Sequence, residues 1–284
     1  MTGDGARARL RTLRFGLATL LGRRPRGFFL PYRYAASTVP PQHYPELESL
    51  FRAAEPAFLG LLDEIDAHAA ALTAIGVAPP PAPRWDQDWF PRLDAAAAYA
   101  LIRRHLPERI VEVGSGHSTR FMARAVADAG LHTQIVAIDP APRAAIDGLG
   151  LDLRRCTLQQ ALDGADEIFR FGARDVLFVD SSHLLVAGSD VDLLLNRVVP
   201  RLPTGALLHV HDVFLPDGYP AAWGWRGYNE QNAIGPLLAH GAFELLFASR
   251  WTATRLAARI DRSILARLPL PDGAWETSLW LRRR

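Results

Sequence analysis

The chain has 284 residues with a formal net charge of +2, and 49% of its residues are hydrophobic. That length and composition predict a folded protein with a sizeable core and exclude an intrinsically disordered chain. The single cysteine, Cys156, excludes a disulfide framework and any metal site made of several cysteines. No run of about 18 apolar residues occurs, so no segment is expected to span a membrane.

All 32 basic side chains are arginine, and lysine is absent. Chemistry that needs a lysine, such as a Schiff base or a Walker-type phosphate loop, is therefore excluded. The arginines are unevenly spread, because eight of them fall within residues 1–40, where Asp4 is the only acidic residue. These eight are Arg7, Arg9, Arg11, Arg14, Arg23, Arg24, Arg26 and Arg33.

Leucines recur at helical spacing among these arginines, at positions 10, 13, 17, 20 and 21, and predict a short amphipathic basic helix. Because Arg11 and Arg14 interrupt the apolar run, we expect no secretory signal and predict a cytoplasmic protein. The helix is interpreted as a solvated arm or packing helix, with contact to an anionic membrane or a partner as the alternative. Without aromatic residues among the arginines, no nucleic-acid partner is expected.

Residues 28–45 are rich in aromatic residues and proline and predict an extended segment. Residues 46–75 carry apolar positions at helical spacing, and Pro56 predicts a kink or a break within that helix. Four prolines within residues 78–83 predict a stiff linker. We therefore predict a basic arm and helical extension over 1–83 and a catalytic domain over 84–284; the extension would suit a homodimer.

Beyond the linker, Asp94 is predicted to cap a helix that ends near His105. Short apolar runs then alternate with helical stretches, which is typical of βαβ units and a parallel sheet. The predicted strands are 109–113, 134–138, 151–155, 176–180, 206–210, 243–247 and 278–281, and the predicted helices are 119–129, 141–149, 158–169, 187–198 and 252–268. We predict an α/β fold: a doubly wound, Rossmann-like sheet of seven mostly parallel strands with an α-helical N-terminal extension.

In such sheets ligands bind at the carboxyl ends of the strands, where the strand order reverses. The first strand runs into VEVGSGHST, where Gly114 and Gly116 allow a tight turn and close approach of a ligand. The second strand ends in Asp139, which can accept hydrogen bonds from ribose hydroxyls. Ser118 stands near the place of the third glycine of a dinucleotide fingerprint, which disfavours a diphosphate, and Glu112 suits an ammonium group.

The segments VEVGSGHST, IDP, LFVDSSH and HVHDVF, in this order and spacing, resemble the class I S-adenosylmethionine-dependent methyltransferases. The resemblance covers about residues 85–284 and is to the branch with metal-dependent O-methyltransferases that act on sugars and small hydroxylated molecules. It implies S-adenosylmethionine as the cofactor, with the ribose at Asp139 and the adenine near Thr157 and Leu158. The implied cofactor-binding set is Glu112, Gly114, Ser115, Gly116, Ser118, Asp139, Thr157, Leu158 and Asp180.

Polar side chains also follow the fourth and fifth predicted strands. Asp180 and His183 lie in VDSSH, and His211 and Asp212 lie in HVHDVF. Because neighbouring parallel strands end at the same edge of a sheet, we expect these side chains on one rim. Two carboxylates and an imidazole can hold Mg²⁺ or Mn²⁺ in an octahedral site. The resemblance implies Asp180, His211 and Asp212 as the metal ligands, although His211 departs from the usual oxygen ligand.

The resemblance also implies a catalytic pair of Asp180 and His183, with His183 as general base, because an unshifted imidazole pKa of about 6.5 suits removal of a hydroxyl proton. Two tryptophan-rich segments, 85–90 and 223–231, are expected to shape the substrate pocket. We predict methyl transfer to a hydroxyl of a small molecule or sugar with divalent-metal assistance. A metal-independent N- or O-methyltransferase, or a His/Asp metal-dependent hydrolase on the same sheet, is the alternative.

Overall fold

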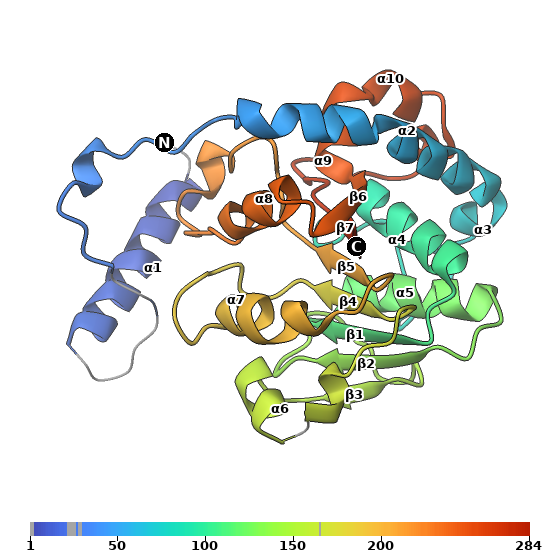
Figure 1. The fold of residues 1–284 in the computed structure, drawn as a ribbon, viewed down its shortest axis with the longest axis horizontal. Coiled ribbons are helices and arrows are strands. Elements are labelled where there is room, and N and C mark those ends of the chain that lie inside the picture. The colour runs from blue at the N-terminus through green and yellow to red at the C-terminus, as the bar shows by residue number, and fades with distance from the viewer. Residues whose placement is uncertain (1–2, 22–26, 28–29, 165) are drawn as a thin grey trace.

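The computed structural model describes residues 3–21, 27, 30–164 and 166–284, and its centre is a seven-stranded sheet (Figure 1). The strand order is β3-β2-β1-β4-β5-β7-β6, with β1 to β5 parallel and β7 antiparallel to β5 and β6. This order confirms the predicted doubly wound, mostly parallel sheet. The strands are β1 (Arg109–Val113), β2 (Gln134–Ile138), β3 (Asp152–Arg154), β4 (Val176–Val179), β5 (Leu207–Val210), β6 (Phe243–Ala248) and β7 (Leu279–Arg283).

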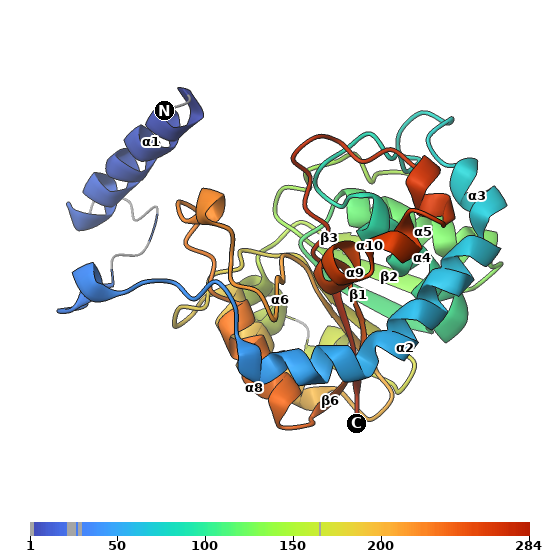
Figure 2. The ribbon, with the colours of Figure 1, turned by 90° about the horizontal axis from the view of Figure 1, so that it is seen from above.

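Helices cover both faces of the sheet, and every residue of β4 and β5 is buried, as the continuous apolar runs predict. Figure 2 shows α4 and α5 on one side of the sheet and α6 and α8 on the other. None of the described helices is long and apolar enough to cross a membrane. The α-helices are α1 (Gly3–Leu20), α2 (Pro45–Ala67), α3 (Ala69–Thr73), α4 (Arg92–His105), α5 (His117–Asp128), α6 (Leu158–Gly164), α7 (Asp190–Leu193), α8 (Gln231–Ala239), α9 (Ser249–Arg255) and α10 (Ala257–Ile260).

Helix α2, from the predicted extension, belongs to the same hydrophobic core as the sheet. It continues through Pro56 and ends at Ala67. The ring of Phe58 lies 5.7 Å from that of Phe247 in β6, centroid to centroid. The boundary predicted at residue 83 therefore separates two segments that share one core. The residues that α2 buries are Phe51, Phe58, Leu61, Leu62 and Ile65.

The predicted extended segment ties the N-terminal region to the loop after β5. Apart from one short 3₁₀ helix (Ala35–Ser37), its residues 30–44 form no helix. The Tyr44 amide donates to the Pro216 carbonyl at 2.7 Å, and the Gly218 amide donates to Gln42. Residues 28 and 29 of this segment, like Arg23, Arg24 and Arg26, lie outside the described residues.

The helix predicted over 141–149 is wrong, because this segment is an irregular loop after β2. Two backbone amides at its start bond to residues outside the segment. The Ala141 amide donates to the Asp139 carboxylate at 2.7 Å, and the Arg143 amide donates to the Ser115 carbonyl at 3.3 Å. Pro142 and Gly148, followed by Gly150, give this short segment little helical preference.

A test of the shared core is Phe58→Ala. We expect it to lower the free energy of unfolding by about 3–5 kcal/mol, since it removes a fully buried ring from the core. The matched control is Leu59→Ala, which truncates the adjacent, exposed leucine of the same helix and should change stability by about 0.5 kcal/mol or less. Urea unfolding followed by circular dichroism measures both. A Phe58→Ala effect no larger than that of the control would contradict a shared core.

Candidate active site

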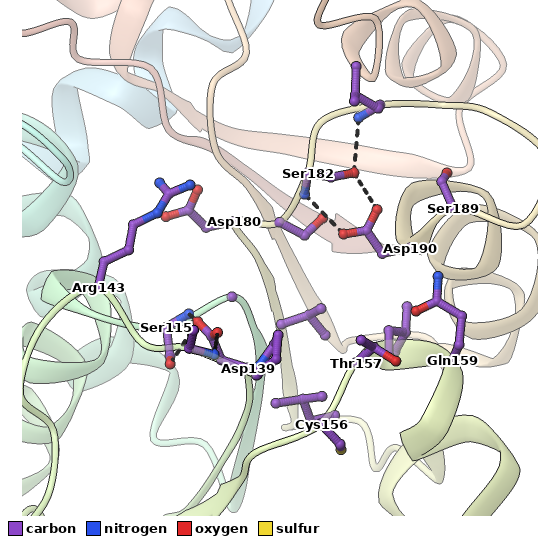
Figure 3. Close-up of a pocket in the computed structure, with 18 of the residues that line it drawn as sticks. Ser115, Asp139, Arg143, Cys156, Thr157, Gln159, Asp180, Ser182, Ser189 and Asp190 are labelled. Carbon is purple, nitrogen blue, oxygen red and sulfur yellow. Dashed lines mark hydrogen bonds between the residues drawn. The ribbon is translucent and has the colours of Figure 1, made fainter. Parts of the chain in front are cut away.

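A cavity of about 510 Å³ opens at the carboxyl ends of β1, β2 and β4, where the strand order reverses. Figure 3 shows Ser115, Asp139, Thr157 and Asp180 around this space, each from a different loop. The position agrees with the general rule for ligand sites in doubly wound sheets. Of the predicted cofactor-binding residues, the cavity wall contains Gly114, Ser115, Asp139, Thr157, Leu158 and Asp180.

Gly114 sits where the chain crosses very close to the end of β4. Its φ is +81°, and a Cβ at this position would lie 1.8 Å from the carbonyl oxygen of Asp180. The Gly114 amide donates to the Ile138 carbonyl at 3.0 Å, and the Asp180 amide donates to Val113 at 2.9 Å. Only glycine fits this crossing, which keeps the ends of β1, β2 and β4 together under the cavity.

Glu112 supports the glycine turn from inside the core. It is fully buried, and its two carboxyl oxygens accept hydrogen bonds from the hydroxyls of Ser118 and Thr119, both at 2.5 Å. Burial raises the pKa of Glu112 to about 8, against the effect of these two hydrogen bonds. Glu112, Gly116 and Ser118 are outside the wall of the cavity, so their predicted contact with the cofactor stays a prediction.

Asp139, directly after β2, holds the glycine turn in place beside the cavity. One of its carboxylate oxygens accepts from the amide of Ser115 at 2.7 Å and from its hydroxyl at 3.1 Å. The other oxygen accepts from the Ala141 amide. The carboxylate remains half-buried at the cavity, where it keeps lone pairs for a ligand hydroxyl.

A second, smaller cavity of about 100 Å³ shares Asp180 and Arg143 with the first. We call it the acceptor-side cavity. His211 and Asp212 line it, whereas His183 lines neither cavity. Both predicted tryptophan-rich segments contribute to its wall, and a third segment that the sequence did not indicate joins them. The wall consists of Asp88, Trp89, Arg143, Asp180, His211, Asp212, Trp223, Arg226, Gly273, Ala274 and Trp275.

His183 is enclosed by carboxylates on both ring nitrogens. Its Nδ1 lies 2.9 Å from Glu230 Oε2, and its Nε2 lies 3.3 Å from Asp180 Oδ1 and 3.4 Å from Asp212 Oδ2. The His183 carbonyl accepts from the amides of Asn229 and Glu230, so the start of α8 is tied to the loop after β4. His183 and Glu230 are 2% and 1% exposed, which places the pair beneath the cavities rather than within them.

His211 forms a second pair, with Asp94 of α4. Its Nε2 lies 3.1 Å from Asp94 Oδ2, and its Nδ1 lies 3.5 Å from Asp180 Oδ1 and 3.6 Å from Asp212 Oδ1. Asp94 also accepts from the amides of Thr277 and Ser278, at 3.0 Å and 2.9 Å. Asp94 thus orients the imidazole through its contact with Nε2, and Nδ1 is directed toward the carboxylates of the acceptor-side cavity.

The charges of this cluster stabilise one another. Burial works against protonation of both imidazoles, but the carboxylates outweigh it, so Asp180 and Glu230 raise the pKa of His183 well above its usual range. Asp180 and Asp212 do the same for His211. Burial of Asp180 is in turn outweighed by the charges of the two imidazoles, which hold its pKa well below the usual range.

Two residues of the cluster have strained backbones. His183 has a φ of +59° and Asp212 a φ of +56°, in the left-handed region that non-glycine residues rarely adopt. Such strain costs about 1–3 kcal/mol per residue and persists where surrounding contacts enforce it, most often at functional sites. The carboxylate–imidazole contacts supply that enforcement here.

The predicted metal ligands come together, but each carboxylate is paired with imidazole nitrogens. Among the described residues, no group of three or more His, Cys, Asp or Glu side chains is arranged to hold a metal ion. The side chains as placed therefore do not fit the predicted Mg²⁺ or Mn²⁺. Asp94 and Glu230, the two carboxylates that orient the imidazoles, were not among the predicted site residues, and Asp94 was expected only as a helix cap.

The burial of Glu112 makes a prediction about stability and pH. Because folding raises its pKa from 4.5 to about 8, the unfolded chain binds fewer protons between these values, and this residue lowers the free energy of unfolding as the pH rises. Glu112→Gln can still pair with both hydroxyls, because its amide oxygen accepts from one and its amide nitrogen donates to the other. We expect this variant to gain stability relative to the wild type by up to about 1.4 kcal/mol per pH unit in that range.

Denaturant unfolding at several pH values measures this difference. Glu108→Gln, at a glutamate whose side chain is 67% exposed, is the matched control and should leave the pH dependence unchanged. Glu112→Ala should instead destabilise the protein at every pH, since it leaves two buried hydroxyls without their acceptor. A Glu112→Gln variant that tracks the wild type across the range argues against a neutral Glu112.

Comparison with known proteins agrees with this arrangement. Residues 111–213 match the family described as "Methyltransferase domain". No curated protein sequence matches the chain. Among solved structures, the chain is similar to the SAH-bound Podospora anserina methyltransferase PaMTH1, with 18% identity, 91% of this chain and 99% of that chain covered, and a TM-score of 0.42.

Two further solved structures are similar. The O-methyltransferase from Bacillus cereus in complex with SAH has 14% identity, covers 79% of this chain and 91% of that chain, and gives a TM-score of 0.42. The MycE methyltransferase of the mycinamycin pathway, in complex with Mg, SAH and mycinamycin VI, has 18% identity, covers 64% and 47%, and gives a TM-score of 0.35. The family match covers the segment that contains the glycine turn, Asp139, Asp180 and His211, so residues 111–213 are similar to a methyltransferase domain.

Proposed function

We propose that the protein transfers a methyl group from S-adenosylmethionine to a hydroxyl group of a small molecule. The observation that carries the proposal is the position of Asp180, which lines both cavities, while His211 and Asp212 line only the acceptor-side cavity. Two bound ligands can react only where their sites adjoin, and these two cavities share part of their wall. Here that wall carries two carboxylates and an imidazole, which are suited to remove a proton from a hydroxyl.

The larger cavity fits the cofactor. The glycine turn at Gly114 and Ser115 would allow the methionine portion to approach the backbone, Asp139 would hold the ribose, and Thr157 and Leu158 would lie beside the adenine; all of these residues line the cavity. When bound, S-adenosylmethionine supplies a methyl group on a positively charged sulfur. The protein's part is to align the acceptor oxygen with that methyl group and to handle the proton.

We assign the role of general base to His211. Its Nε2–H donates to Asp94, which leaves Nδ1 as the nitrogen that faces the acceptor-side cavity. As the hydroxyl oxygen forms its bond to the methyl group, Nδ1 takes the hydroxyl proton, which requires the neutral form of the ring. Because burial is outweighed by Asp180 and Asp212, which raise the pKa of His211, we expect the rate of methyl transfer to rise with pH as this ring loses its proton. Asp94 fixes the tautomer and orientation of the ring and is a positioning residue. Its carboxylate is itself held by two backbone amides, which suits that role.

This assignment replaces the expectation that His183 is the base. Carboxylates lie near both ring nitrogens of each imidazole, but His211 lines the acceptor-side cavity, whereas His183 lines neither cavity. We assign His183 a positioning role. Its Nε2 holds Asp180 and Asp212 where the two cavities adjoin, and Glu230 orients the ring through Nδ1. Tryptophan side chains of the acceptor-side cavity can stack on a flat or sugar ring, which supports a phenol, a catechol or a sugar as the acceptor.

The base assignment is tested with His211→Ala and His183→Ala. We expect methyl transfer from tritium-labelled S-adenosylmethionine, across a panel of phenols, catechols and sugars, to fall about 100-fold or more in His211→Ala. Added imidazole should restore part of the rate in His211→Ala, because this site opens onto a cavity. It should not restore the rate in His183→Ala, whose site is closed.

Calorimetric titration with S-adenosylhomocysteine is the control for an intact cofactor site. His211→Ala should bind within about threefold of the wild type, whereas Asp139→Ala should bind at least about tenfold more weakly through loss of the ribose contact. Imidazole rescue of His183→Ala but not of His211→Ala would reverse the assignment. Full activity of His211→Ala on an amine acceptor would favour N-methyl transfer.

The role of a metal is tested by chelation. No step above runs through a divalent cation, since the described side chains do not fit one as placed. We expect EDTA treatment followed by buffer exchange to leave the rate of methyl transfer within about twofold of the untreated protein, and added Mg²⁺ or Mn²⁺ not to raise it. A large loss that either ion restores would instead support the metal-assisted reaction at Asp180, His211 and Asp212.

A further inference from the structure

We propose that α1 binds the surface of an anionic lipid bilayer and holds the enzyme there with its acceptor side next to the membrane. The observation behind this proposal is a row of exposed leucines on α1. At 100° per residue these leucines fall within an arc of about 100° on the helix. Their exposed fractions are 69% for Leu10, 60% for Leu13, 51% for Leu17, 64% for Leu20 and 70% for Leu21.

Arginines border this apolar face on both sides. On the helical projection Arg7 and Arg14 lie along one edge, and Arg9 lies along the other. Asp4 is the only acidic residue before Glu46. An exposed apolar face bordered by cations is the arrangement of helices that lie in the headgroup region of anionic membranes, with leucines among the acyl chains and arginines at the phosphates.

The opposite face of α1 is turned to the rest of the protein. Thr12, Phe15 and Thr19 line a groove of about 610 Å³ together with the loop 225–229. The guanidinium of Arg11 lies 4.7 Å from the ring centroid of Trp225 in that loop. The views in Figures 1 and 2 both place α1 at the edge of the molecule, apart from the sheet. Leu20, at the edge of the leucine face, also lines this groove, whereas Leu10, Leu13, Leu17 and Leu21 do not, so most of the leucine face points away from the protein.

Charge favours a bilayer over a second copy of the chain as the occupant of this face. A symmetric dimer through the leucines would bring the bordering arginines of two copies together, and like charges in close contact are unfavourable. Anionic headgroups neutralise the same arginines, each contributing about 1 kcal/mol near the surface. The leucines could be buried against either a bilayer or a second copy of the chain, so the charge of the bordering arginines is what favours the bilayer.

The position of α1 connects the membrane to the acceptor side. Arg226 lines both the groove under α1 and the acceptor-side cavity, and Leu184 lines both the groove and the cofactor cavity. Bilayer attachment through α1 therefore places the entrance region of the site beside the lipid surface. This attachment does not depend on the identity of the methyl acceptor.

Co-sedimentation of the full chain with vesicles tests the proposal. We expect binding to vesicles of phosphatidylcholine and phosphatidylserine, weaker binding to phosphatidylcholine alone, and loss of binding as salt increases. The variant Leu13→Glu with Leu17→Glu should bind the anionic vesicles at least about tenfold more weakly. Its matched control is Leu59→Glu with Leu270→Glu, which adds the same charge at exposed leucines outside α1 and should bind like the wild type.

Two control measurements distinguish a loss of membrane binding from misfolding and from a change in oligomeric state. S-adenosylhomocysteine titration shows that each variant retains the folded cofactor site, so weak vesicle binding cannot be ascribed to misfolding. Light scattering after gel filtration reports the oligomeric state. The proposal is overturned if the wild type stays in the supernatant with anionic vesicles, if the α1 variant binds as well as its control, or if the wild type is a dimer that the α1 variant converts to a monomer.

Discussion

A buried network of alternating carboxylates and imidazoles stabilises the candidate active site. It runs from Asp94 through His211 to Asp180 and Asp212, and on through His183 to Glu230. An unpaired buried charge lowers the stability of the folded state, so each charged side chain of the network depends on its partners. Separating the elements that carry these side chains would break the pairs and is therefore unfavourable. The network joins α4, the ends of β4 and β5 and the start of α8. It also enforces the left-handed backbones of His183 and Asp212, and it sets Asp180 where the two cavities meet.

The cofactor side depends on a steric constraint rather than on charge. Gly114 passes so close to the carbonyl of Asp180 that no side chain fits, and this crossing brings the glycine turn against the end of β4. Glu112 then fixes the turn from the core through two hydroxyls, and Asp139 fixes it from the other side through Ser115. The same crossing places the cofactor loop and the network in contact, because Asp180 belongs to both. The two cavities and the carboxylate–imidazole network thereby share one residue, Asp180.

The acceptor side is assembled from segments that are far apart in the chain. Trp89 precedes α4, Trp223 follows β5 and Trp275 precedes β7, and all three reach one small cavity. The loop that follows Trp223 also contacts α1, so the region that selects the acceptor and the region that we propose to meet the membrane adjoin one another. Helix α2 does not contribute to this cavity: it completes the core beside β6 and α9.

The sequence by itself determined what depends on local pattern. Apolar runs of four to six residues located the seven strands to within about two residues, and the glycine turn, Asp139 and Asp180 were recognisable because each directly follows a strand. Tertiary structure decided what depends on side-chain direction and on distant partners. Asp94 reaches His211 across 117 residues and Glu230 reaches His183 across 47, which no local spacing reveals. The loop 141–149 is irregular, and its Arg143 amide bonds to Ser115 of the glycine turn, a contact that the sequence pattern does not reveal. His211 rather than His183 lines the acceptor-side cavity because packing, not sequence position, sets which imidazole is enclosed.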